Sequence, residues 1–386
     1  MQINKAAAMR VIRLANIVGE SGFDFSHLHF MALMPSGKDN ELEAYFANNT
    51  ITAKMRLPLT EGPAQEVCLP KKEVLRFLAA CGETDIAIQV HGDTARLNQG
   101  KSRMVARTIP VSGFPFPLDE PVSFRIPITA RNLQAALYLC CGLASSSHEA
   151  SNLDVHLALD DGLQVYTTDG KNLAHAEIPL EDAEATELAT AQVDIGLSVK
   201  TANTLLKLLD SLDEAERVIL EITERSLVLH DMAYEWSCHC LLKAESPAVP
   251  WRRVAERQKI QEICSVTDIA ALQDSMEVCM AVSDDKYVAV MLTVDEDALS
   301  LELENEKGSS TGSTTEIDVV HPHRSYVPFL PLKTLLSFCQ KFQDAGPGQL
   351  RISKIELPQG SPLKWDWLVE TGLKNLFIVT AAYLNK

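Results

Sequence analysis

The chain has 386 residues, of which 46% are hydrophobic and 23% are charged, and its 52 acidic residues outnumber its 35 Lys and Arg to give a net charge of −17. This length favours two to four domains over a single core, and the composition argues against a disordered chain. The charge alone argues against nucleic-acid binding, because phosphates require Lys and Arg, unless basic side chains gather on one restricted surface.

The first 121 residues are expected to form one domain that opens with an amphipathic helix over 5–18. A second helix, over 69–78, has Pro70 in its first turn. The proline-rich segment 109–117 is a poor helix or central strand and a natural linker. Alternating apolar runs separated by turn residues predict strands within 25–68 and at 85–90, 94–97 and 100–107.

The same order of helix, strands, helix and strands is predicted twice more, in domains at 122–250 and 251–386. The polar segment 304–315 is expected to be a mobile loop of the third domain. Helical spacing predicts helices at 129–143, from Leu197, at 267–282 and from Leu330. Strands are predicted at 153–159, 163–168, 218–222, 226–230, 287–294, 299–303 and 376–382.

A ten-residue pattern marks the second helix of each predicted domain. It has Leu first, Pro or Ser second, Lys fourth and a large apolar residue ninth, and its copies begin at Leu69, Leu197 and Leu330. The copies are 128 and 133 residues apart, which is the length of a small domain. The pattern predicts an α+β fold of three similar domains, each with two helices packed on antiparallel sheets.

Basic residues at helical spacing share one face of each of these second helices, while the first helix of the third domain carries Asp268, Asp274 and Glu277 and no Lys or Arg. Such a basic face is either a binding surface or an ordinary solvated one. The basic residues that we single out are Lys72 with Arg76, Lys200 with Lys207, Lys333 with Lys341, and in the first helices Lys5, Arg10, Arg13 and Arg131.

Nine cysteines include no Cys-x-x-Cys pair, and we expect them to be reduced and buried. Alternation along a strand would place the sulfurs of Cys238 and Cys240 on one face and His239 on the other, which disfavours a metal site there. We expect neither a metal nor a cofactor. No apolar run of about 18 residues and no signal-peptide pattern is present, so a cytoplasmic protein without membrane contact is expected.

Three segments, GKSRM at 100–104, TDGKNLA at 168–174 and WRRV at 251–254, resemble those of a known family in their order and spacing. This family is the bacterial sliding clamp, the β subunit of DNA polymerase III. The resemblance covers nearly the whole chain and is weakest in the first 65 or so residues. It implies a homodimeric ring of six like domains, with the helices lining a hole through which double-stranded DNA passes without sequence readout. The basic residues above would then face DNA, and only this inner wall must be basic.

The function implied by the resemblance is that of a processivity factor in DNA replication, which binds linear peptides of DNA polymerase and clamp-loader subunits. Carried over by position, the hydrophobic peptide cleft between the second and third domains would include Thr168, Gly170, Lys171, Leu173, Val249, Arg253, Val254, Tyr287, Ile378, Thr380, Ala382 and Leu384. Strand and interdomain core positions are the other interpretation of this set. At the dimer seam, Arg103 and Met104 of one protomer would meet Ala281 and Val282 of the other.

Two alternatives remain open. A clamp-like peptide-binding scaffold that does not encircle DNA is favoured by the acidic helix at 268–277. An enzyme is disfavoured, because Asp160 and Asp161 lie in a predicted turn and the serines at 145–147 lack a nucleophile-elbow context. The sequence also contains no glycine-rich phosphate loop.

Overall fold

The computed structural model falls into two compact units, a first unit of residues 1–131 and 204–244 and a second unit of 132–203 and 245–386. The second predicted domain contributes strands to both. The residues that the structure describes are 1–19, 26–80, 82, 85–146, 153–159, 162–169, 172–180, 193–213, 215–243, 260–283, 289–342, 350–355, 365–371 and 377–381.

Each predicted helix is present, and the prediction of an α+β fold is confirmed. Leu69 and Pro70 belong to a strand, so the second helix begins at Lys71 and not at Leu69. Proline suits this strand end, where its missing N–H costs little. Among the described residues the α-helices are α1 (Lys5–Val18), α2 (Lys71–Ala80), α3 (Ala130–Ser146), α5 (Val199–Leu209), α7 (Ile269–Cys279) and α8 (Phe329–Lys341).

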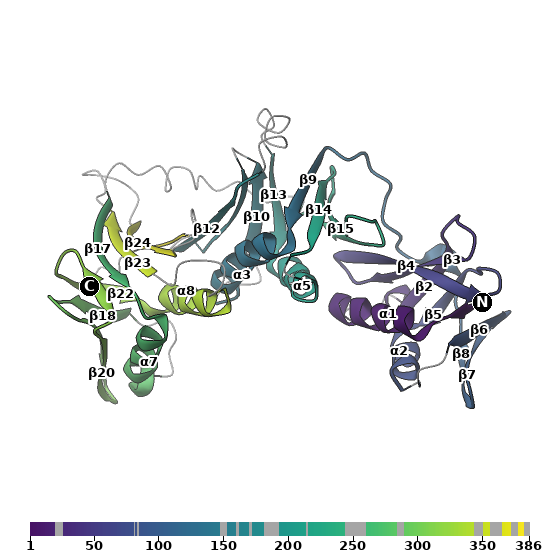
Figure 1. Ribbon diagram of the computed structural model, residues 1–386, viewed down its shortest axis with the longest axis horizontal. Coiled ribbons are helices and arrows are strands. Elements are labelled where there is room, and N and C mark those ends of the chain that lie inside the picture. The colour runs from purple at the N-terminus through teal and green to yellow at the C-terminus, as the bar shows by residue number, and fades with distance from the viewer. Residues whose placement is uncertain are drawn as a thin grey trace. The chain divides into compact units, whose positions relative to one another are not determined.

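Helix α1 shows why these segments are helical. The Asn4 side chain caps it by accepting a hydrogen bond from the Ala7 N–H at 2.7 Å. Its apolar stripe is buried, and it ends at Gly19, whose φ of 73° suits glycine. The Lys5 ammonium donates to the carbonyl of Leu78 at 2.7 Å, which ties α1 to α2. Figure 1 shows these two helices side by side.

One sheet of twelve strands forms the core of the first unit, and every strand pair in it is antiparallel. Its strands are β1 (Gln2–Ile3), β2 (Phe30–Pro35), β3 (Glu41–Ala47), β4 (Ile51–Glu61), β5 (Val67–Pro70), β6 (Ile86–His91), β7 (Thr94–Gln99), β8 (Ser102–Arg107), β9 (Phe124–Thr129), β14 (Arg217–Ile222), β15 (Ser226–Asp231) and β16 (Trp236–Leu241).

Nine-stranded and four-stranded antiparallel sheets form the second unit, where α3 and α8 lie side by side in Figure 1. Its strands are β10 (Asp154–Leu159), β11 (Leu163–Thr168), β12 (Asn172–Ile178), β13 (Val193–Ser198), β17 (Ile260–Val266), β18 (Ala289–Val294), β19 (Leu299–Asn305), β20 (Gly308–Thr314), β21 (Ile317–Val319), β22 (His323–Pro328), β23 (Leu350–Ile355), β24 (Trp365–Thr371) and β25 (Phe377–Ala381).

A single topology recurs three times along the chain. Each predicted domain contains two three-stranded meanders, β2-β3-β4 and β6-β7-β8 in the first. The strand that opens the domain, β1, β9 or β17, pairs with the first strand of the second meander. The strand before the second helix, β5, β13 or β22, pairs with the first strand of the first meander. The two halves of each domain therefore exchange a strand.

Two joints extend these sheets from one domain to the next. In the first unit β4 pairs with β16, with Met55 opposite Trp236. In the second unit β12 pairs with β25, with Leu173 opposite Val379. Both joints follow one rule, since the last strand of a first meander pairs with the last strand of the next domain's second meander. In the part of the chain that the structure describes, β8 and β20 are sheet edges that lack such a neighbour.

The prediction of a mobile loop at 304–315 is wrong, because most of this segment forms strand β20. A Cβ atom added at Gly312 would lie 1.8 Å from the backbone oxygen of Ser275 in α7. The Ser275 hydroxyl also donates to the carbonyl of Ser313 at 2.8 Å. Because α7 packs so close to β20, the strand must use small residues there, and its sequence therefore lacks the apolar alternation of a strand.

Three smaller expectations also change. Residues Ser26–His29, within a predicted strand region, form a 3₁₀ turn. The third domain's first helix ends at Cys279, followed by a 3₁₀ turn at Met280–Val282. The predicted linker is docked on the first domain, since Phe114 is buried against Leu28.

The cysteines behave as predicted where the structure describes them. Eight are free and buried. The sulfurs of Cys238 and Cys240 lie 4.0 Å apart on one face of β16, and burial raises the pKa of the Cys141 thiol to about 12. Within the described ranges no cluster of His, Cys, Asp and Glu could hold a metal ion, and no helix is long and apolar enough to cross a membrane.

Candidate nucleic-acid interface and peptide cleft

The three second helices, α2, α5 and α8, present basic side chains to solvent. Each predicted pair is exposed, which agrees with the shared face that the helical spacing indicates. Exposed Lys and Arg can move to meet phosphate groups at little desolvation cost, so these helices have the chemistry of a sequence-independent DNA surface. The exposed pairs are Lys72 with Arg76, Lys200 with Lys207, and Lys333 with Lys341.

The basic residues of α1 are more constrained than the sequence indicates. Lys5 donates to the carbonyl of Leu78 and is half-buried. The Arg10 guanidinium lies 2.7 Å from the Glu235 carboxylate, which offsets its charge. Arg13 is exposed and lines a cavity described below. Arg131, at the start of α3, is half-buried. We conclude that α1 contributes less positive charge to the surface than its three basic residues suggest.

Lys341 at the end of α8 also has an interaction that sequence spacing does not predict. Its ammonium lies 4.7 Å from the ring centroid of Tyr138 in α3, within cation–π range. The same ring packs edge-on against Phe342 at 5.6 Å between centroids. These contacts hold α3 against α8 in the second unit.

The acidic residues near α7 have different roles. Asp268 is the N-cap of α7, because its side chain accepts the Ala271 N–H at 3.0 Å. Glu277 accepts a hydrogen bond from the Gln273 amide at 3.0 Å and is exposed. Asp274 is exposed as well. One of the three carboxylates therefore has a structural explanation, and the other two leave α7 with an acidic surface.

The joint between β12 and β25 brings together those predicted cleft residues that the structure describes. Ile378 and Thr380 of β25 stand opposite Ala174 and Asn172 of β12. The Thr168 hydroxyl donates to the carbonyl of Asn172 at 2.7 Å, which closes the turn between β11 and β12. The predicted residues Gly170, Lys171, Val249, Arg253, Val254, Tyr287, Ala382 and Leu384 lie outside the described residues.

Leu173 is fully buried in β12. Its side chain therefore packs in the interior of the second unit and is not on an open surface. This favours the structural interpretation for Leu173, while half-buried Thr168 at the end of β11 stays accessible.

The predicted seam residues lie at the two sheet edges. Arg103 is exposed and Met104 half-buried on β8, while Ala281 is exposed and Val282 half-buried in the turn after α7. Sequence reasoning missed Val105 on β8, an apolar side chain that is 56% exposed. It also missed that β8 carries Arg103 and Arg107 while β19, beside β20, carries Glu302 and Glu304. The alternation of SRMVAR at 102–107, with Arg103, Val105 and Arg107 on one face, could have indicated the exposed Val105 and the basic edge.

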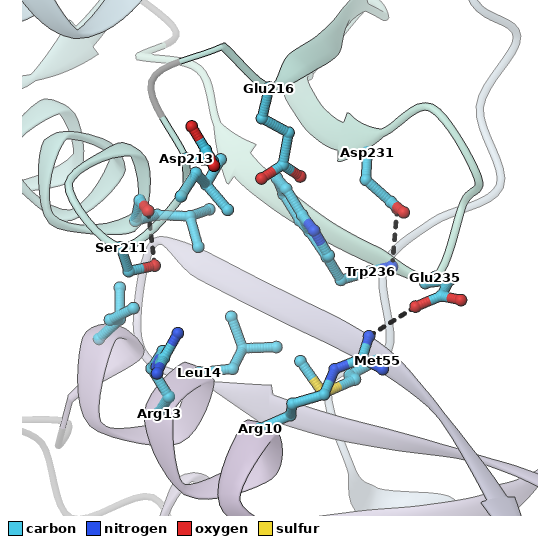
Figure 2. A pocket seen from close by; sticks show the side chains of 13 residues that line it. Arg10, Arg13, Leu14, Met55, Ser211, Asp213, Glu216, Asp231, Glu235 and Trp236 are labelled. Atoms are coloured by element: carbon cyan, nitrogen blue, oxygen red, sulfur yellow. Dashed lines mark hydrogen bonds and ion pairs between the residues drawn. The ribbon is translucent and has the colours of Figure 1, made fainter. Parts of the chain in front are cut away.

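A cavity of about 270 Å³ in the first unit was also not predicted (Figure 2). It is formed where α1 meets β4, the turn after α5, and the start of β16. No motif signals it, because its walls come from segments up to 226 residues apart in the sequence. The lining residues include Arg10, Arg13, Asp213, Glu216 and Trp236.

The described strands form repeated meander pairs that share sheets at their joints, with two helices in each predicted domain. No family model and no curated protein sequence matches the chain. Among solved structures, it is similar to the DNA polymerase sliding clamp of Pseudomonas aeruginosa, solved with a ligand, at 16% identity and a TM-score of 0.82, covering 100% of this chain and 99% of that one.

Two further structures extend the comparison. The DNA polymerase sliding clamp of Bacillus subtilis is 14% identical with a TM-score of 0.80, covering 100% of this chain and 99% of that one. The polymerase III β of Caulobacter crescentus is 18% identical with a TM-score of 0.79 and full coverage of both chains. At these identities the likeness shows the fold, and the predicted clamp fold is confirmed.

Proposed function

We propose that the chain is a DNA sliding clamp, a cytoplasmic processivity factor of three domains at 1–121, 122–250 and 251–386. Two copies would close head to tail into a ring around double-stranded DNA. The observation that carries this proposal is the strand-pairing rule. Joints β4–β16 and β12–β25 each pair the last strand of a first meander with the last strand of a second meander. The same rule assigns edge strand β20 to β8 of a second copy, and three domains per chain then give a ring of six.

The chemistry of the two edges supports this pairing. Arg96, Arg103 and Arg107 share one face of β7 and β8, since Arg96 pairs with Val105. Glu302 and Glu304 share the corresponding face of β19, next to β20, and both are exposed. Opposite charges on two edges of one chain favour a head-to-tail contact between copies and disfavour contact between identical edges.

Burial of Val105 would add an apolar contribution to the seam. A Val side chain that moves from water to an interior contributes about 1.5 kcal/mol or more. This supports Arg103 and Met104 on one side of the seam and Ala281 and Val282 on the other, with Val105 added. Paired edges would also remove the unpaired N–H and C=O groups of β8 and β20.

The proposed DNA surface consists of the exposed basic pairs on α2, α5 and α8. A ring holds DNA topologically, so it needs weak phosphate contacts and no base readout. An overall charge of −17 is compatible with this arrangement when the basic residues gather on the helices and the acidic residues lie elsewhere. We assign Lys5 and Arg10 a smaller part, because each has a partner within the first unit.

We place the partner-peptide site at the β12–β25 joint, where strands of the second and third domains meet. Polymerase and clamp-loader subunits would bind there through linear peptides. A related Pseudomonas aeruginosa sliding clamp has been solved bound to griselimycin, so clamps of this fold can hold a ligand. Leu173 would support the cleft from beneath, and Thr168 would lie at its edge.

Two measurements test the ring. Sedimentation equilibrium should give a dimer of two 42.5 kDa chains at micromolar concentration. After loading by a cognate clamp loader, the protein should remain on nicked circular DNA and leave when the circle is cut. A monomer that shows no difference between circular and linear DNA would contradict encirclement.

A clamp-like scaffold that binds peptides without encircling DNA is the second candidate, because exposed Asp274 and Glu277 make α7 unfavourable for phosphate. This candidate expects the chain to bind clamp-binding peptides with no retention on circular DNA. The neutralising double variant Asp274→Asn with Glu277→Gln separates the two candidates further. If α7 faces DNA in a ring, the double variant should increase retention at 0.2 M salt, and in a scaffold it should change nothing.

A further inference from the structure

The apolar floor of the cavity in the first unit includes the two residues that pair across the β4–β16 joint, Met55 and Trp236. Met55 and Trp236, which pair across this joint, are 6% and 7% exposed. A volume of about 270 Å³ is at the small end of ligand pockets, so it suits one or two large side chains better than a whole cofactor. The apolar lining is Leu14, Ile17, Met55, Leu208, Leu212 and Trp236.

Carboxylates dominate the polar part of the lining. Arg10 is paired with Glu235 at 2.7 Å, and Figure 2 shows this pair at one side of the cavity. Asp231 accepts the backbone N–H of Trp236 at 3.0 Å. Asp213 and Glu216 lie on the upper wall in Figure 2, opposite Arg13 on α1.

Once Arg10 and Glu235 offset each other, three carboxylates face one guanidinium, so the cavity has an excess of negative charge. The Glu216 carboxylate is half-buried in the lining of the cavity. A cationic group that enters beside the apolar residues would pair with it.

We propose that this cavity binds a short peptide segment in which a large apolar side chain stands next to Lys or Arg. The apolar side chain would fill the floor between Leu14 and Trp236. The neighbouring cation would pair with Glu216 and Asp213, as charge complementarity requires. Anionic occupants, DNA included, are disfavoured by the same carboxylates.

The fold gives this position a counterpart. The β4–β16 joint of the first unit obeys the same pairing rule as the β12–β25 joint of the second unit, where we place the partner-peptide site. In the first unit the cavity lies between helix α1 of the first predicted domain and the strand ends of the second. The proposal goes beyond the proposed function, since it assigns a second peptide site of different charge preference to each chain.

The test uses the full-length chain without DNA and two synthetic peptides, acetyl-Ser-Lys-Phe-Lys-Ser-amide and its acidic counterpart acetyl-Ser-Glu-Phe-Glu-Ser-amide. Calorimetry should show the basic peptide binding about tenfold or more tightly than the acidic one. In protein labelled with ¹³C at the Met methyl groups, the basic peptide should shift the Met55 signal, which is assigned by its loss in Met55→Leu.

Charge-reversal variants provide the decisive comparison of the two peptides. Glu216→Lys should weaken binding of the basic peptide about tenfold and strengthen binding of the acidic one. If this variant folds poorly, Asp213→Lys, at an exposed position, should change both affinities in the same direction. Glu224→Lys is the matched control, because Glu224 is an exposed carboxylate outside the cavity. Equal binding of both peptides, an unmoved Met55 signal, or a 20-base-pair DNA duplex that moves it instead would overturn the proposal. A protein that fails to encircle DNA would leave these outcomes unchanged.

Discussion

The Arg10 guanidinium and the Glu235 carboxylate form an ion pair of 2.7 Å across 225 residues of sequence, and it joins α1 to the bend that precedes β16. Both side chains are about half exposed, at 46% and 52%, so the pair contributes roughly 0–1 kcal/mol to stability. Its larger effect is on charge, because Glu235 offsets one of the few basic side chains of α1.

The first prediction concerns this pair. Glu235→Gln should free Arg10, strengthen DNA retention, and make the slope of log affinity against log salt steeper by about 0.9 if Arg10 then contacts one phosphate. The free energy of unfolding should change by less than about 1 kcal/mol. Electrophoretic mobility shifts over a series of salt concentrations measure the slope, and Glu224→Gln is the control. An unchanged slope would place Arg10 away from DNA.

The second prediction concerns the seam. Val105→Asp should raise the dimer dissociation constant by at least about tenfold, because it places a carboxylate in an interface that we expect to be apolar at this point. The unfolding midpoint of the monomer should change little, since Val105 is 56% exposed. Light scattering during gel filtration reports the mass. Val320→Asp, at a position 49% exposed and outside the seam, should remain dimeric.

The third prediction separates stability from peptide binding at the second joint. Leu173→Ala should lower the free energy of unfolding by about 2–5 kcal/mol, because the side chain is fully buried. Urea denaturation measures this loss. Thr168→Val removes the hydroxyl that closes the β11–β12 turn and should weaken a clamp-binding peptide at smaller cost in stability. The cleft assignment would be contradicted if Thr168→Val bound the peptide normally and Leu173→Ala lost affinity only to the extent that it unfolds.

The fourth prediction concerns close packing between α7 and β20. Gly312→Ala should destabilise the third domain by more than about 2 kcal/mol, because the new Cβ atom would overlap the backbone oxygen of Ser275. Dimer formation should weaken with it, since β20 is the proposed seam strand. Gly82→Ala is the control, because a Cβ atom there meets nothing within 4 Å. Thermal unfolding followed by circular dichroism compares the two.

The fifth prediction concerns pH. Burial, with a smaller contribution from Lys54, lowers the pKa of His239 from 6.5 to about 4. As the pH falls below 6.5, His239 becomes protonated in the unfolded chain while it stays neutral in the folded protein. The contribution of His239 to the free energy of unfolding is therefore full above pH 6.5 and declines towards pH 4. The total loss from this group is about 3 kcal/mol at most. Urea midpoints between pH 7 and 4 should fall less steeply in His239→Gln than in the wild type.

Much of the architecture could be predicted because local pattern and fold agree. The apolar spacing of α1 predicts its bounds, and the ten-residue pattern that contains Lys72, Lys200 and Lys333 indicates three equivalent helices. Strand β20 could not be predicted from the sequence. Its residues are small and polar because the backbone of Ser275, which is distant in sequence, packs closely against them. Local periodicity reports burial on one side of an element and not the distance to the element that covers it.

The candidate site was predictable in type and less so in detail. Exposure of Lys72 and Lys200 follows from helix geometry alone. The contacts of Lys5 with Leu78 and of Lys341 with Tyr138 depend on tertiary packing, so sequence spacing could not predict them. The cavity beside Trp236 has walls from several distant segments and leaves no local signature.

The strand exchange inside each domain has a consequence for synthesis on the ribosome. Strand β1 pairs with β6, so Ile3 can form its strand pair only after Ile86 has been translated. Likewise Phe124 of β9 can pair only after Ile222 of β14 has been translated. Neither half of a domain can complete its sheet alone, and such long-range pairing folds slowly. We therefore expect nascent chains truncated before β6 to bind chaperones and to resist folding, whatever the stability of the finished protein.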